Sequence, residues 1–195
     1  MKADNSGSMR FEENGERIKD LKLILGRVSY AASLFDDDGI QVRFMNAAVV
    51  QVNPAMLNGI RTEQQVEALF PHVYYSGLTP LGTELKKQVI EPLVLGPARS
   101  GQLRKPVLIV TITDGQPAGE EPLTLDQTIS YTGQELSRMP QYGKHACKFQ
   151  FAQVGNDQSA REFLAELDEK KTIGDVVDCT SSNISLLLPL SDESD

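Results

Sequence analysis

Three oxygen-bearing side chains lie on alternate residues near the start of the chain. The stretch Asp4-Asn5-Ser6-Gly7-Ser8 carries one carboxylate and two hydroxyls, on Asp4, Ser6 and Ser8. In a turn, alternate side chains can converge on one point and bind a hard cation. Mg²⁺ prefers oxygen ligands in near-octahedral geometry and keeps several waters, so one carboxylate with two hydroxyls is an incomplete site. We expect the remaining ligands to come from elsewhere in the chain.

Two later stretches can supply the missing oxygens. Thr79 follows Gly77-Leu78 and precedes a predicted helix, while Asp114 follows the β-branched run Val107 to Ile112. Such a run is typical of a strand buried on both faces of a parallel sheet, and open α/β sheets bind ligands at the carboxyl ends of their strands. We expect Asp114 at a loop tip, so that Asp114→Ala abolishes cation binding at little cost to folding.

The elements that must position these residues alternate between helix and strand. The hydrophobic periodicities predict helices over 18–35, 62–70, 81–92, 126–139 and 157–170, and strands over 40–45, 107–112, 148–154 and 175–179. Residues 48–52 are expected to pair as an antiparallel edge strand with 40–45, and residues 96–105 to form a loop. The pattern predicts a doubly wound, three-layer α/β/α fold with a mostly parallel sheet.

Composition favours one globular domain. The chain has 195 residues, of which 40% are hydrophobic and 24% charged, and its net charge is −8. This charge argues against nucleic acid or an anionic membrane as a partner. No apolar run approaches the roughly 18 residues of a membrane span. Cys147 begins one predicted strand and Cys179 ends the next, so we expect two free thiols and an intracellular, cytoplasmic setting.

The three oxygen-bearing motifs together, in this order, resemble the metal-ion-dependent adhesion site of the von Willebrand factor type A domain. The phrases FQFAQVGND (149–157), FLAELD (163–168) and GDVVDCTS (174–181) are similar to intracellular members of this family that are common in fungi. The resemblance covers nearly the whole chain. It implies a Rossmann-like α/β fold and a single domain over residues 1–190, followed by a polar tail over 191–195.

The resemblance also implies a ligand set. Ser6 and Ser8 would bind Mg²⁺ or Mn²⁺ directly, Thr79 directly or through water, and Asp4 and Asp114 largely through water. The open coordination position would take an Asp or Glu carboxylate from a partner protein. A site with few directly bound charges leaves its cation electrophilic, which supports this interpretation.

The sequence departs from the family at both ends. Only Met1-Lys2-Ala3 precede Asp4, whereas the family places a longer buried strand there, so we expect a truncated first central strand. The usual last helix is replaced by 185–190 (SLLLPL). A truncated product or a fragment of a longer protein is therefore expected.

Three functional hypotheses follow. The first is a metal-dependent protein-binding module without enzymatic activity. The second is a scaffold with a vestigial site, and the third is a Mg²⁺-dependent phosphotransferase or phosphatase with Asp4 as nucleophile. The third lacks the second carboxylate that its chemistry requires, because position 6 is Ser. His72 and His145 lie in predicted loops remote in sequence from the motifs, so neither is expected to act as a general base. The sequence leaves the oligomeric state open.

Overall fold

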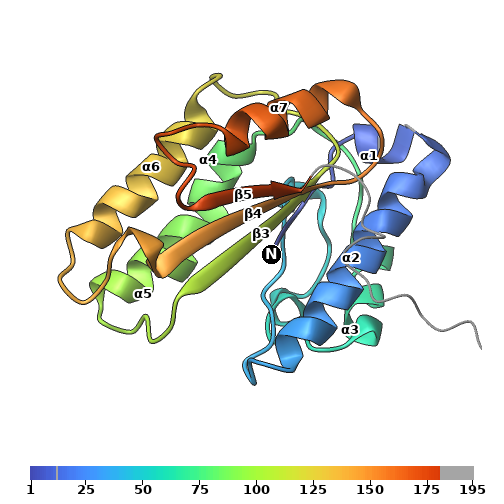
Figure 1. Ribbon diagram of the computed structural model, residues 1–195. Helices are drawn as coiled ribbons and strands as arrows, with labels where there is room; N and C mark the ends of the chain where they lie inside the picture. Colours follow the sequence, from blue (N-terminus) through green and yellow to red (C-terminus); the bar gives the residue numbers. More distant parts are fainter. Residues whose placement is uncertain (12, 181–195) are drawn as a thin grey trace, which may run out of the picture.

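A parallel sheet forms the centre of the molecule. The computed structural model describes residues 1–11 and 13–180, and in this part of the chain five parallel strands form one sheet with the order β2-β1-β3-β4-β5 (Figure 1). The strands are β1 (Lys2–Ala3), β2 (Arg43–Phe44), β3 (Val107–Thr113), β4 (Cys147–Gln153) and β5 (Val177–Thr180). The α/β fold predicted from the sequence is therefore confirmed.

Helices connect the strands. The α-helices are α1 (Ser8–Phe11), α2 (Glu16–Ser33), α3 (Glu63–Glu67), α4 (Leu81–Leu85), α5 (Gly96–Arg99), α6 (Thr124–Ser137) and α7 (Gln158–Asp168). A π-helix covers Lys86–Leu95, and short 3₁₀ segments cover Glu13–Gly15, Ala47–Val49, Pro54–Leu57, Phe70–His72 and Lys144–Ala146. Helix α3 begins with a capping box, in which Thr62 and Gln65 are the two partners.

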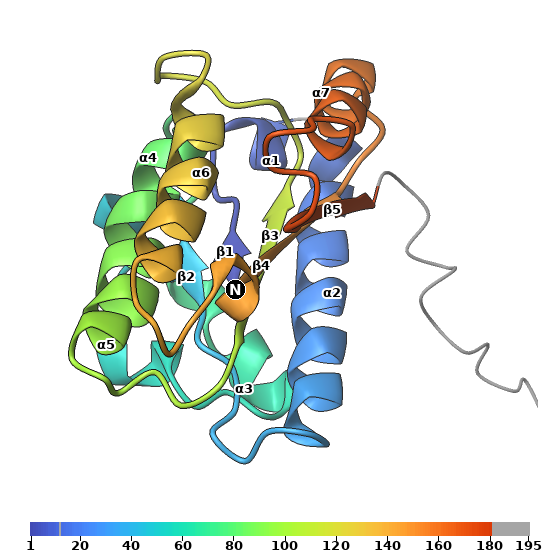
Figure 2. The ribbon, with the colours of Figure 1, turned by 60° about the vertical axis from the view of Figure 1, so that its left-hand side comes forward.

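The helices cover the two faces of the sheet in two groups, as Figures 1 and 2 show. One group, α2 and α3, packs on Val110 and Ile112 of β3. The other, α4 to α7, packs on Ile109 and on Phe149 and Phe151 of β4. Alternate residues of β3 thus enter opposite cores, as expected for a strand buried on both faces. The sheet therefore lies between two layers of helices.

The short first strand occupies a central position. Lys2 pairs with Arg43 on one side and with Thr111 on the other, and Ala3 pairs with Phe44 and Ile112. The backbone N–H of Asp4 donates to Ile112 O at 2.9 Å and extends this ladder by one bond. This strand has two residues and joins β2 to the rest of the sheet.

The predicted antiparallel edge strand is wrong. The edge strand β2 runs parallel to β1, and the antiparallel contacts of this region are two isolated bridges, between Ile40 and Ile60 and between Val50 and Val73. The backbone N–H groups of Arg43 and Met45 donate to β1, whereas the next acceptor in this ladder, Asn5 O, accepts from Ser76 N at 3.0 Å. The Asn5 side chain also accepts from Asn46 N at 2.7 Å, and the chain turns into the 3₁₀ segment Ala47–Val49.

The helix expected to end near Pro92 is longer. It passes through Pro92 as a π-helix, in which Gly96 N donates to Glu91 O, and continues as α5 to Arg99. An α-helical turn would press the Pro92 ring against the carbonyl of residue 88, and the wider π turn relieves that overlap. The predicted loop over 96–105 consequently begins after Arg99.

The two cysteines are free, as predicted. Cys179 pairs with Phe151, four residues along β4 from Cys147, which corresponds to about 13 Å at about 3.3 Å per residue. The expectations for residues 185–190 and for the polar tail 191–195 concern residues outside the described part of the chain. Within the described residues, no helix is both long and apolar enough to cross a membrane.

Candidate functional site

The candidate site lies where the chain direction across the sheet reverses. From β1 the chain passes through α2 to β2, while from β3 it passes through α6 to β4, on the opposite face. The carboxyl ends of the neighbouring strands β1 and β3 therefore open into a crevice between diverging connections, the place where open α/β sheets bind ligands. Asp4 follows β1 directly, and Asp114 follows β3.

The first motif forms a tight, hydrogen-bonded turn. Asp4 Oδ1 accepts from the backbone N–H of Ser6 at 2.8 Å, and the hydroxyls of Ser6 and Ser8 lie 3.0 Å apart. Asp4 and Ser6 are buried, and Ser8, the first residue of α1, is partly exposed. Thr113 Oγ1 donates to Asp4 Oδ2 at 2.7 Å. Thr113, the last residue of β3, thus fixes the Asp4 carboxylate from the neighbouring strand.

The Thr79 loop is held against the first motif by backbone contacts. Gly7 N donates to Gly77 O at 3.1 Å, and Ala118 N donates to Thr79 O at 2.9 Å. Gly77 has φ +93°, and a Cβ there would lie 2.8 Å from Asn46 Oδ1, so this position requires glycine. Asn46 Nδ2 also donates to Leu78 O at 3.0 Å. Asn46 was not singled out from the sequence, and no motif there marks its role.

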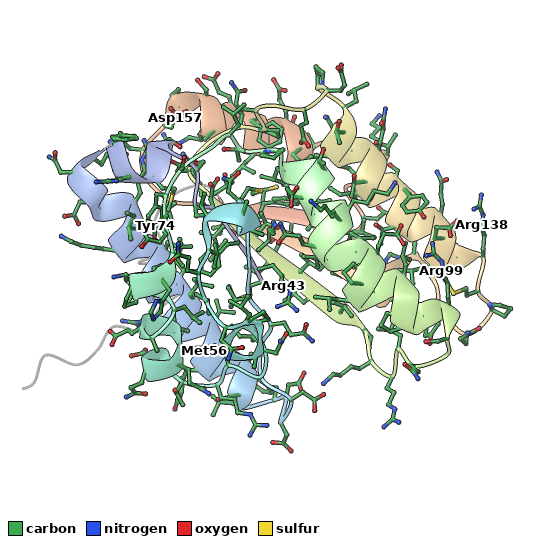
Figure 3. The ribbon with its side chains drawn as sticks, turned by 180° about the vertical axis from the view of Figure 1, so that it is seen from behind. Arg43, Met56, Tyr74, Arg99, Arg138 and Asp157 are labelled. Carbon is green, nitrogen blue, oxygen red and sulfur yellow. The ribbon has the colours of Figure 1, made fainter. Side chains whose placement is uncertain are left out.

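Three of the predicted ligands line one pocket. The pocket has a volume of about 310 Å³, and its wall includes Ser6, Ser8, Thr79, Gly115, Asp157 and Ser159. Figure 3 shows Asp157 at the start of α7, at the same edge of the molecule as α1. Asp157 caps this helix by accepting from Ala160 N at 2.8 Å. Asp4 and Asp114 are not in the wall: their carboxylates are buried at the strand ends.

Burial and a neighbouring charge act on Asp4. The pKa of its carboxyl rises to about 6, mainly because burial disfavours the charged form and then because of the negative charge on Asp114. Hydrogen bonds from Ser6 and Thr113 oppose this rise by stabilising the carboxylate. Two adjacent buried carboxylates create a demand for positive charge at this edge of the sheet.

Asp114 receives positive charge from α2. Arg17 Nη1 donates to Asp114 Oδ2 at 2.8 Å, and the same guanidinium contacts Glu13 Oε1 through Nε and Nη2, both at 2.9 Å. Asp114 is only 1% exposed, so the expectation that it occupies an exposed loop tip is wrong: α2 packs over it. Its other oxygen, Oδ1, is buried and has no hydrogen-bond partner in the described part of the chain.

Sequence reasoning missed Arg17 and Glu13, although one signal was present. Arg17 lies four residues before Leu21 and eight before Leu25, both of which are fully buried. A charged residue on the buried stripe of an amphipathic helix needs a partner, and periodicity could have marked it. Periodicity alone does not identify that partner.

The donor set suits a hard cation bound without histidine or cysteine. Carboxylates and hydroxyls are the ligands that Mg²⁺ and Mn²⁺ prefer. Within residues 1–11 and 13–180, no group of three or more His, Cys, Asp or Glu side chains is placed to hold a metal ion, so a cation here would depend on the hydroxyls of Ser6, Ser8 and Thr79. His72 and His145 are both exposed, in the 3₁₀ segments Phe70–His72 and Lys144–Ala146.

Comparisons with protein-family models and with curated protein sequences found no match to this chain.

Proposed function

We propose that the chain is a metal-dependent protein-binding module. Mg²⁺ or Mn²⁺ would occupy the pocket at the ends of β1 and β3, bound directly by Ser6 and Ser8, directly or through water by Thr79, and through waters by Asp4 and Asp114. When bound, the cation supplies an electrophilic position that a carboxylate from a partner protein can complete. This is the mode of the von Willebrand factor type A domain, which the three motifs resemble.

One observation carries the proposal. Three loops that are far apart in sequence bring five oxygen-bearing residues to one end of the sheet, and a buried carboxylate oxygen there, Asp114 Oδ1, has no partner among the described residues. A buried carboxylate oxygen without a hydrogen bond is unfavourable, so native proteins usually provide it with a partner or an ion. A hydrated divalent cation in the adjoining pocket would supply the missing partner.

The rim of the pocket favours a protein as the partner. Phe11 and Leu78 are 79% and 61% exposed. Phe11 packs beside Gly7, since a Cβ on that glycine would lie 3.8 Å from the ring, and Leu78 packs in the same way on Gly119. Exposed apolar side chains beside a polar pocket are typical of interaction sites. A partner that offers a carboxylate next to an apolar side chain would satisfy both features.

Water relaxation of the Mn²⁺-loaded chain tests this function. We would add short peptides with one Glu beside a Leu and compare each with the same peptide carrying Gln. Displacement of a metal-bound water by the carboxylate should lower the proton relaxivity, and the Gln peptides should leave it unchanged. Equal responses to the Glu and Gln peptides, or none at millimolar peptide, would contradict carboxylate recognition. The double variant Ser6→Ala, Ser8→Ala provides the metal-free control.

A further inference from the structure

Arg17 places a buried positive charge next to the proposed metal site. It lies in the first turn of α2 and is 3% exposed, and its guanidinium bridges the carboxylates of Glu13 and Asp114. An arginine is charged at every pH at which the chain folds, and burying it requires compensation by negative charge. The Arg17 charge is therefore a permanent part of this end of the sheet.

The surrounding backbone is shaped to hold this ion pair. Gly155, in the turn after β4, has φ +76°, and a Cβ there would lie 2.5 Å from Arg17 Nε and 2.8 Å from Glu13 Oε1. The next residue, Asn156, donates its backbone N–H to Glu13 Oε1 at 3.1 Å. Glu13 itself has φ +50°, a left-handed conformation that is rare outside glycine. The backbone at two separate turns, one at Glu13 and one at Gly155-Asn156, is thus shaped around the Arg17–Glu13 pair.

The two oxygens of Asp114 have different surroundings. Oδ2 accepts from Arg17, while Oδ1 is buried without a partner in the described residues. Arg17 therefore neutralises much of the Asp114 charge without occupying the oxygen that remains available. A divalent cation near Oδ1 would be attracted to a weakened negative charge and repelled by the guanidinium.

We propose that Arg17 is a built-in counter-cation of Asp114, which lowers the affinity of the site for a divalent cation and keeps the bound cation dependent on a partner carboxylate. This inference rests on the proposed function and assigns regulation to the same site. Arg17 does not touch the cation. It acts through Asp114.

Calorimetric titration of the purified chain with Mn²⁺ tests the proposal. Arg17→Gln removes the positive charge and should bind Mn²⁺ roughly tenfold to a hundredfold more tightly than the wild type, as expected for one unit charge a few ångströms from the cation. Arg17→Lys keeps the charge and should stay within about threefold of the wild type. Lys19→Gln, on the exposed side of α2, controls for net charge and should leave affinity unchanged.

A second variant covers the case in which Arg17→Gln does not fold. Arg17→Met fills similar space without a polar group. Its thermal midpoint should rise more with saturating Mn²⁺ than that of the wild type, because the cation replaces the lost charge beside Asp114. Failure of both variants to fold even with saturating Mn²⁺ would contradict the proposal, since the cation would then be unable to replace Arg17.

The outcomes separate this inference from the proposed function. If the wild type binds Mn²⁺ and folded Arg17→Gln binds equally or more weakly, Arg17 only positions Asp114 and the counter-cation role is overturned. If Arg17→Lys binds as tightly as Arg17→Gln, charge is not the cause and the role is overturned as well. If neither the folded wild type nor the folded Arg17 variants bind Mn²⁺, the metal site itself is refuted.

Discussion

The ends of β1 and β3 bury their carboxylates in different ways. Asp4, after β1, is surrounded by neutral donors, namely the Ser6 backbone N–H and the Thr113 hydroxyl, while Asp114, after β3, is paired with the guanidinium of Arg17. Neutral donors offset only part of the cost of burying a charge, and the pKa of Asp4 rises to about 6. The charge of Asp114 is thus paired with a cationic side chain, although its Oδ1 lacks a partner among the described residues, whereas both oxygens of Asp4 have partners but these partners are neutral.

The largest expected effect is that of Asp114→Ala. Removing this carboxylate takes the Asp114 partner from the buried Arg17, and breaking a buried ion pair on one side costs about 3–5 kcal/mol. This expected loss of stability is much larger than the small folding cost predicted from the sequence. Urea denaturation of the metal-free chain measures the loss. A loss below about 1 kcal/mol would mean that the Arg17–Asp114 pair does not stabilise the fold.

The opposite result is expected for Asp4→Asn. Asparagine has nearly the same shape and can still accept from Ser6 N, but it carries no charge to bury. At pH 7.5 and without metal, the variant should be more stable than the wild type by about 3 kcal/mol, since the raised pKa of Asp4 reports a cost of about this size. The same urea series measures it. A destabilised Asp4→Asn would remove the contrast between the two carboxylates.

The difference between Asp4→Asn and the wild type should depend on pH. Between the ordinary pKa of an aspartate, 3.8, and about 6, the folded chain binds more protons at Asp4 than the unfolded chain does. The contribution of Asp4 therefore favours folding below about pH 4 and is lost as the pH rises through about 6, by up to about 1.4 kcal/mol per pH unit. Metal-free stabilities at pH 4, 5, 6 and 7.5 check this. A difference between variant and wild type that stays constant over this range would contradict the raised pKa.

Thr113→Val gives the smallest change. It removes the hydrogen bond to Asp4 Oδ2 and the longer one from Gly115 N, and should cost about 1–2 kcal/mol, since each lost hydrogen bond contributes about 1 kcal/mol. The pKa of Asp4 should rise further above about 6, since Thr113 normally lowers it. A carboxyl titration followed by NMR would detect the shift. An unchanged pKa would show that Thr113 does not stabilise the charged form.

The sequence predicted the parts of the fold that local patterns determine. The run Val107 to Ile112 marked a buried strand, and periodic apolar residues marked α2 to within two residues at each end. Asp4 was chosen because it begins the Asp-x-Ser-x-Ser pattern, and Asp114 because it follows a predicted buried strand. In the structure both residues lie at the carboxyl ends of the neighbouring strands β1 and β3.

Other features depend on tertiary contacts that no local pattern encodes. The Arg17–Asp114 pair joins residues 97 positions apart, and it buries a carboxylate that the sequence placed at an exposed tip. The edge strand β2 ends where the Asn5 carbonyl accepts from Ser76 N and the Asn5 side chain accepts from Asn46 N. In both cases a contact with a distant segment overrides the local preference.

The most direct measurement is calorimetric titration of the folded chain with Mg²⁺ and Mn²⁺, run beside Ser6→Ala, Ser8→Ala and beside Ser159→Ala. Ser159 contributes a hydroxyl to the same pocket but lies outside the proposed ligand set. We predict one bound cation in the wild type and in Ser159→Ala, and no detectable binding in the double variant. Unchanged binding in the double variant, or no binding by the folded wild type, would contradict a cation site at the ends of β1 and β3.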